Sequence, residues 1–262
     1  MRDPGEGLAP DGTIRTGVAR ERVPAAYEPV LTAAVGASGR AGASLLLYGS
    51  VATGRVQPGS DVDLLAVGVD ADEVSAISAQ LSGRFGALCR RVEIGTAQPT
   101  DFSGPGDEAY GNRVFLRHYC LLLSGADFRT GWPAYPGDAR AARGFNGDLD
   151  RHLARWRADL PAAGPDEAAA LGRRVARKTL LALAGLVSVH DATWTTDRAT
   201  AVRRWSDVAP ALAPGLTRLL AWADGRVGAD GAEVAVVLAT DGVVARIRDA
   251  YAARVGMWPV GV

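Results

Sequence analysis

Two aspartates that stand two residues apart carry the strongest chemical signal in the chain. Asp61 precedes and Asp63 lies within Val62–Val67, an apolar segment whose pattern predicts a strand. Because residues i and i+2 of a strand point to the same face, the two carboxylates are expected side by side. Their repulsion is tolerable when a divalent cation lies between them, and oxygen ligands suit Mg²⁺. The pair therefore predicts a magnesium site.

A Gly-Ser step upstream of this pair predicts an anion site. Gly49 and Ser50 follow the short apolar run Leu45–Tyr48, which is typical of a buried strand. Gly49 has no side chain to block a phosphate, and Ser50 offers a hydroxyl and a backbone N–H at the start of a turn or helix. The same atoms of Ser50 could serve only as a helix cap. A phosphate site beside a metal site implies phosphoryl or nucleotidyl transfer.

A third carboxylate is expected on a neighbouring strand. Glu93 lies among apolar residues in Leu88–Ile94, which alternates as a third strand would. If that strand lies beside the aspartate strand, Glu93 completes a cluster with Asp61 and Asp63. It could then bind a second metal ion or accept the proton of an attacking hydroxyl. The alternative is an exposed glutamate on an edge strand, paired with Arg91.

The order of these residues resembles the DNA polymerase beta-like nucleotidyltransferase superfamily. The pattern of that superfamily is Gly-Ser, a spacer, Asp-x-Asp and a later carboxylate in an apolar strand, and it covers residues 44–95 here. The resemblance assigns catalysis and two Mg²⁺ ions to three carboxylates: Asp61, Asp63 and Glu93. It assigns the triphosphate of ATP or another NTP to Gly49 and Ser50. We add Ser60, directly before the first aspartate, as a further candidate for nucleotide binding.

The elements around the motif predict an α+β fold. A helix over residues 25–35 and an amphipathic helix over 72–85 accompany the strands, and the chain after Asp148 reads as helical to its end, with residues 231–254 as one helix. We therefore expect three parts. These are a flexible N-terminal arm (1–22), a nucleotidyltransferase domain with a mixed sheet and helices (23–145), and a C-terminal all-α helical bundle (146–262).

This domain order looks like that of the aminoglycoside nucleotidyltransferases, in which acceptor and nucleotide lie in the cleft between two domains. In that superfamily a basic residue of the second domain commonly reaches the triphosphate. Lys178, the one lysine among 29 basic residues, is our candidate, because a compact ammonium neutralises phosphate as a point charge. The alternative is a solvated residue on a basic surface.

Composition excludes several classes of protein. With 29 basic and 29 acidic residues the formal net charge is +0, which argues against a protein that coats nucleic acid or an anionic membrane. No apolar run approaches the roughly 20 residues of a membrane helix, and the polar start does not resemble a secretory signal. Cys89 and Cys120 form neither a disulfide framework nor a zinc motif. We expect a cytoplasmic protein.

Together these patterns predict an enzyme that moves a nucleoside monophosphate, by default AMP from ATP, onto a hydroxyl of a small acceptor such as an aminoglycoside and releases pyrophosphate. One alternative keeps the chemistry and modifies a protein or tRNA, as toxin–antitoxin nucleotidyltransferases do. Another is a non-catalytic nucleotide sensor, which the presence of all three carboxylates argues against. The sequence leaves open the base of the NTP, the acceptor, the oligomeric state, and a role in antibiotic resistance, biosynthesis or regulation.

Overall fold

The computed structural model describes residues 3–40 and 43–259. The chain divides into two compact units, with the main boundary in the sequence between Tyr135 and Pro136. Asp3–Ala9 and Thr13–Tyr135 belong to unit 1, and the chain from Pro136 onward belongs to unit 2 together with Pro10–Gly12. The predicted boundary at residue 145 falls inside a helix of unit 2, α5 (Ala139–Asn146). None of the described helices combines the length and the apolar character that a membrane span requires.

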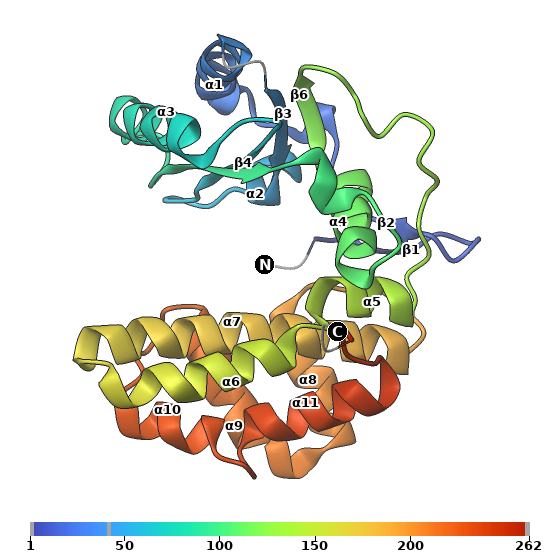
Figure 1. Cartoon of the computed structure of the whole chain (residues 1–262), viewed down its shortest axis with the longest axis vertical. Helices are drawn as coiled ribbons and strands as arrows, with labels where there is room; N and C mark the ends of the chain where they lie inside the picture. Colours follow the sequence, from blue (N-terminus) through green and yellow to red (C-terminus); the bar gives the residue numbers. More distant parts are fainter. Residues whose placement is uncertain (1–2, 41–42, 260–262) are drawn as a thin grey trace. The chain divides into compact units, whose positions relative to one another are not determined.

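Unit 1 is built on a mixed four-stranded sheet in the order β5-β4-β3-β6 (Figure 1). Its strands are β3 (Ser44–Tyr48), β4 (Val62–Val67), β5 (Val92–Ala97) and β6 (Leu121–Ser124). β4 runs parallel to β5 and antiparallel to β3, which also pairs antiparallel with β6. The mixed sheet confirms the predicted fold class. The third strand starts later than residue 88 because Leu88 and Cys89 close a turn on Phe85.

Alternation along β4 separates two faces of the sheet. Val62, Leu64 and Ala66 are fully buried and pack under α1 (Glu28–Arg40) and α3 (Ala71–Arg84). This apolar layer forms the main core of unit 1, because every second residue of neighbouring strands points into it. The predicted helix over 25–35 is a 3₁₀ turn, η2 (Ala25–Tyr27), followed by α1.

The other face is covered over part of its area only. The 3₁₀ helix η3 (Pro99–Phe102) and α4 (Asp107–His118) contribute Phe102 and Leu116, which pack on Leu46 and Val67. The rings of Phe102 and Phe128 stack at 4.9 Å. This cluster covers the end of the face that carries Val67, and the side chain of Asp63 lies on the same face at the start of β4.

The N-terminal segment is more ordered than the expected flexible arm. Two short strands, β1 (Gly7–Leu8) and β2 (Ile14–Arg15), pair antiparallel, and η1 (Arg20–Arg22) follows. The Tyr119 hydroxyl donates to Glu6 Oε1 at 2.8 Å, which ties this segment to the end of α4. Its many Gly and Pro residues turn the chain between these contacts.

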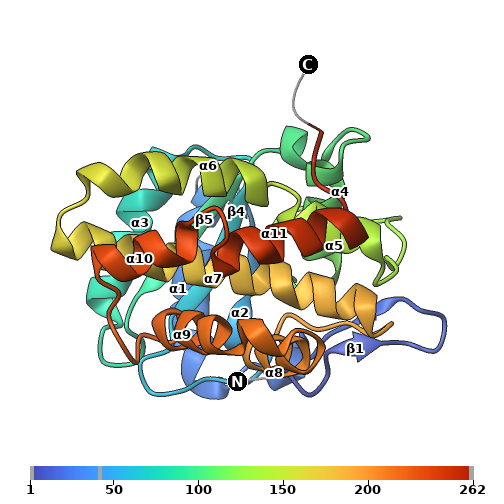
Figure 2. The ribbon, with the colours of Figure 1, turned by 90° about the horizontal axis from the view of Figure 1, so that it is seen from below.

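Unit 2 is all-helical and is organised around α7 (Pro165–His190), the long helix in its centre (Figure 2). The other helices of the unit pack on α7: α5, α6 (Leu149–Asp159), α8 (Arg198–Val208), α9 (Ala213–Ala223), α10 (Gly231–Leu238) and α11 (Val243–Arg254). Two 3₁₀ turns, η4 (Leu160–Ala162) and η5 (Pro210–Leu212), join neighbours. The predicted helix over 231–254 is wrong, because the chain breaks at Ala239–Gly242 to form α10 and α11.

Candidate active site

Strand register sets three polar side chains in one row across the sheet. Tyr48 of β3 pairs with Asp63 of β4, which in turn pairs with Glu93 of β5. Paired residues of neighbouring strands point to the same face. The expected neighbourhood of Asp63 and Glu93 is therefore present, with a tyrosine on the opposite side of the aspartate. Asp61 directly precedes β4, and its side chain is 12 % exposed.

The Gly-Ser step lies against the central aspartate. Gly49 begins the short helix α2 (Gly49–Ala52) with a φ of +74°. A Cβ on this glycine would overlap Oδ2 of Asp63. Position 49 thus requires glycine for two reasons, its left-handed backbone and the close approach of a carboxylate. Ser50 is partly exposed beside it.

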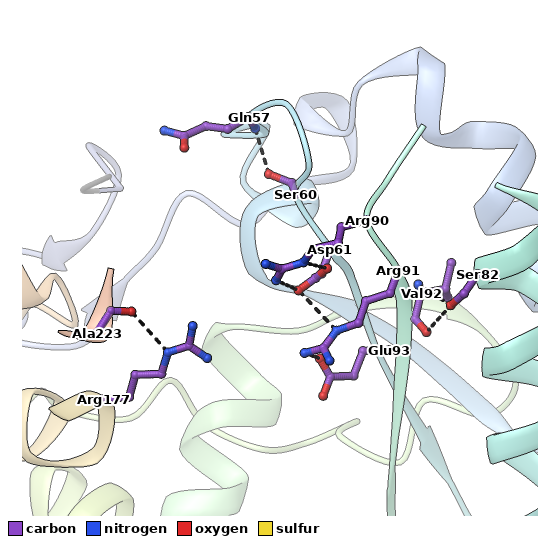
Figure 3. A network of polar contacts seen from close by, with 10 residues as sticks. All are labelled: Gln57, Ser60, Asp61, Ser82, Arg90, Arg91, Val92, Glu93, Arg177 and Ala223. Atoms are coloured by element: carbon purple, nitrogen blue, oxygen red, sulfur yellow. Dashed lines mark hydrogen bonds and ion pairs between the residues drawn. The ribbon is translucent and has the colours of Figure 1, made fainter. Parts of the chain in front are cut away.

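Ser60 has a local structural role. Its hydroxyl accepts the backbone N–H of Gln57 at 2.8 Å, and its own N–H donates to Gln57 O at 2.9 Å (Figure 3). These bonds close the turn that leads into Asp61. The structure therefore accounts for this serine as a turn residue, and its binding of a nucleotide stays a prediction.

Two arginines neutralise the outer carboxylates of the site. Arg90 pairs with Asp61 through both nitrogens of its fork, with Nε 3.0 Å from Oδ1 and Nη2 on Oδ2 (Figure 3). Arg91 bridges Asp61 and Glu93, with Nε 3.5 Å from Asp61 Oδ2 and Nη2 2.7 Å from Glu93 Oε2. The hydrogen bond from Arg90 lowers the pKa of Asp61 below its ordinary value.

The pKa of Asp63 is shifted in the opposite direction from that of Asp61. Burial raises the pKa of Asp63 to about 6, and the nearby charges of Asp61 and Glu93 add to that rise. Burial and the charges of Asp63 and Glu93 also raise the pKa of Tyr48 to about 12, so its hydroxyl is neutral at pH 7. A carboxylate in such surroundings favours any arrangement that brings positive charge to it.

The residue types of this site fit a hard divalent cation. Three carboxylates are available, and glycine at position 49 lets Oδ2 of Asp63 lie close to the backbone without a clash. In the conformation that the structure describes for residues 3–40 and 43–259, no three acidic, His or Cys side chains are grouped to hold a metal ion. Both oxygens of Asp61 are bound by Arg90, so an ion at Asp61 would have to replace that arginine.

Comparison with known proteins identifies a domain in the segment that holds the Gly-Ser and Asp-x-Asp residues. Residues 34–88 match the family model of the nucleotidyltransferase domain. No curated protein matches the chain significantly. The matched segment contains Gly49, Ser50, Asp61 and Asp63 and ends before Glu93. A nucleotidyltransferase domain supports nucleotidyl transfer in general, and it implies a nucleotide as one substrate.

The family match leaves Glu93 to be judged on geometry. Its side chain is 50 % exposed on β5, an edge strand, and pairs with Arg91. The alternative of an exposed, paired glutamate thus describes part of its surroundings. Its register beside Asp63 is the other part, and it sets Glu93 next to that partly buried carboxylate. Both the ligand role and the base role stay predictions.

Lys178 makes its contacts within unit 2. Its Nζ lies 2.6 Å from Asp148 Oδ1 and donates to Phe145 O at 3.2 Å. The other oxygen of Asp148 lies 3.0 Å from Nε2 of His152. Lys178 therefore ties α7 to the junction of α5 and α6. A role at the nucleotide would require it to leave Asp148, and that role stays a prediction.

Sequence reasoning missed the tyrosine and one of the two arginines. Tyr48 was only the last residue of an apolar run, because its register against Asp63 depends on the turn between β3 and β4. The sequence pattern suggests Arg91 only as a partner of Glu93, and it gives no role to Arg90. The signal that could have found the arginines is the Arg-Arg pair directly before the strand of the third carboxylate.

Proposed function

We propose that the protein is a Mg²⁺-dependent nucleotidyltransferase that transfers AMP from ATP to a hydroxyl of a small acceptor, such as an aminoglycoside. The acceptor oxygen forms a bond to the α-phosphorus as the bond from that phosphorus to the bridging oxygen breaks, and pyrophosphate leaves. The observation that carries this proposal is Asp63, a partly buried carboxylate that lies against Gly49 and in register with Glu93.

The carboxylates would hold the metal ions and the reacting hydroxyl. Asp61 and Asp63 are the proposed ligands of Mg²⁺, and Glu93 is a third ligand or the base. When bound, Mg²⁺ stabilises charge on the entering and leaving oxygens of an in-line displacement. The raised pKa of Asp63, about 6, supports this role, because a nearby cation offsets the repulsion that raises it.

Gly49 and Ser50 would hold the triphosphate. Gly49 is exposed, and Ser50 is partly exposed, so both can be reached by a ligand. The missing side chain at Gly49 lets its backbone approach the carboxylate of Asp63, so a phosphate bound at this backbone would lie beside that carboxylate. Proximity of these two features would align the α-phosphorus with the acceptor hydroxyl.

Glu93 would remove the proton of the acceptor hydroxyl. A base has to be reachable by an incoming substrate, and the half-exposed side chain of Glu93 on an edge strand meets that condition. The proton would move to a carboxylate oxygen of Glu93 as the new O–P bond forms. Arg91, which now binds Oε2, would have to leave one oxygen free.

The partners in this proposal are a nucleotide and a small hydroxyl-bearing acceptor, without nucleic acid or membrane. It places the reaction in the cytoplasm, where triphosphates are present and buried thiols such as Cys89 and Cys120 stay reduced.

The test is acceptor-dependent release of pyrophosphate. Purified protein with Mg²⁺ is mixed with each of the four NTPs across a panel of aminoglycosides, with a reaction lacking acceptor as the blank. Asp63→Asn is the test variant, and Asp72→Asn, an exposed aspartate at the start of α3, is the matched control. We expect release that needs one acceptor and is abolished in Asp63→Asn alone. Equal release by the two variants would refute the assignment.

A further inference from the structure

Arg90 and Arg91 occupy the carboxylate oxygens that the proposed metal ions need. Arg90 uses both oxygens of Asp61 in a two-pronged pair, and Arg91 adds a contact to Asp61 and one to Glu93. A guanidinium fork matches a carboxylate in this way, and it matches a phosphate equally well. Neither arginine carries a role in the proposed reaction so far.

Backbone hydrogen bonds hold both arginines beside the site, while their guanidinium groups are exposed and able to rotate. The Arg90 N–H donates to Ser60 O at 3.3 Å, and the Val62 N–H donates to Arg91 O at 3.0 Å. These bonds join the segment before β5 to the segment before β4. The side chains themselves are 64 % and 52 % exposed. Their guanidinium groups can therefore change partners without a change in the fold.

Charge decides which partners can coexist. Three carboxylates lie near two guanidinium groups here, and the two arginines pair with Asp61 and Glu93 (Figure 3). A divalent cation on Asp61 would place like charges side by side if Arg90 stayed. Once displaced, the two arginines need an anion, and the nearest one in nucleotidyl transfer is a polyphosphate.

We propose that Arg90 and Arg91 couple metal binding to nucleotide binding. Without nucleotide they neutralise Asp61 and Glu93, and with nucleotide their guanidinium groups bind phosphate oxygens and free the carboxylates for the divalent cation. This inference rests on the proposed function, since it presumes a metal and a polyphosphate at the same site. Metal and polyphosphate then strengthen each other's binding by the same factor.

The first measurement is Mn²⁺ binding without nucleotide, followed by the electron paramagnetic resonance signal of free Mn²⁺. We expect Arg90→Gln and Arg91→Gln to bind Mn²⁺ roughly five-fold more tightly than the parent chain, because a competitor for Asp61 has been removed. Arg84→Gln is the control, since it removes the same charge from α3, where Arg84 lies over the ring of Phe85. Its Mn²⁺ affinity is expected to change less than about two-fold, because distant surface charges are screened.

The second measurement is binding of inorganic tripolyphosphate in EDTA, by titration calorimetry. Tripolyphosphate carries no base, so the result does not depend on which NTP the protein uses. We expect Arg90→Gln and Arg91→Gln to bind it roughly five-fold more weakly, with Arg84→Gln unchanged. The two arms thus shift in opposite directions, which a purely structural role of either arginine would not produce.

The outcomes separate the inference from the proposed function. Unchanged or weaker Mn²⁺ binding in both arginine variants, with Mn²⁺ binding still lost in Asp63→Asn, overturns the coupling and leaves the metal site standing. Tighter Mn²⁺ binding with unchanged tripolyphosphate affinity overturns the phosphate part of the proposal. Absence of Mn²⁺ binding in the parent chain and in both arginine variants overturns the metal site together with the coupling.

Discussion

Replacement of Gly49 by alanine tests the contact on which the site is built. Two effects add in this variant. Alanine at a φ of +74° costs about 1–2 kcal/mol, because its Cβ approaches the following carbonyl. The same Cβ overlaps Asp63 Oδ2, and relief of such an overlap by movement of neighbours costs about 1–3 kcal/mol. We expect Gly49→Ala to lose about 3 kcal/mol of unfolding free energy in total.

A second glycine separates the two effects. Gly59 has a φ of +76°, yet a Cβ there would meet nothing within 4 Å. Gly59→Ala therefore carries the backbone strain alone, at about 1–2 kcal/mol. Both variants are compared by urea unfolding followed by circular dichroism, and by acceptor-dependent release of pyrophosphate. Only Gly49→Ala should lose turnover, since only it displaces the carboxylate of Asp63.

A double-mutant cycle makes the reasoning refutable. In an Asp63→Ala background the overlap no longer exists, so Gly49→Ala should cost no more than Gly59→Ala does. If Gly49→Ala costs the same in both backgrounds, or matches Gly59→Ala in the parent chain, the close approach of Gly49 and Asp63 is refuted as the reason for a glycine at this position.

Further predictions concern the acids, the lysine and the core. The folded-state pKa of Asp63, about 6, lies above its ordinary value of 3.8, so the folded state binds a proton more tightly than the unfolded state and stability falls as pH rises from 4 to 6. Asp63→Asn should therefore be more stable than the parent chain above pH 6, by on the order of 2 kcal/mol. This gain should vanish near pH 4, as measured by urea titrations at each pH. Glu93→Gln should lower turnover more than nucleotide affinity if Glu93 is the base, whereas equal losses in the two indicate a metal ligand. Lys178→Ala should weaken nucleotide binding, measured by calorimetry, if Lys178 leaves Asp148 for the triphosphate. Unchanged affinity would show that Lys178 serves only the ion pair with Asp148. Leu64→Ala, at a fully buried position, should cost about 2–5 kcal/mol, and a smaller loss would contradict the packing of the main core.

The part of the fold that could be predicted is the part that local periodicity determines. Val62–Val67 and the amphipathic helix α3 follow directly from patterns of two and of three to four residues. The break in 231–254 was missed because both of its halves keep helical spacing. The Ala239–Gly242 turn interrupts them, and a Cβ on Gly242 would overlap the carbonyl oxygen of Val237 at 2.5 Å. A single glycine in an apolar helix pattern is too weak a signal for such a break.

The residues of the candidate site also divide into those that local sequence patterns predict and those that depend on the tertiary structure. Asp61, Asp63 and Gly49 could be found because strand geometry and the lack of a side chain act over a few residues. Glu93 needed the order of strands, and the parallel pairing of β4 with β5 supplies it. The arginines depend on something the sequence does not contain, namely which partner a flexible side chain selects when several are in reach. Since Arg90 fits a carboxylate and a phosphate alike, its partner is set by whatever else is bound at the site.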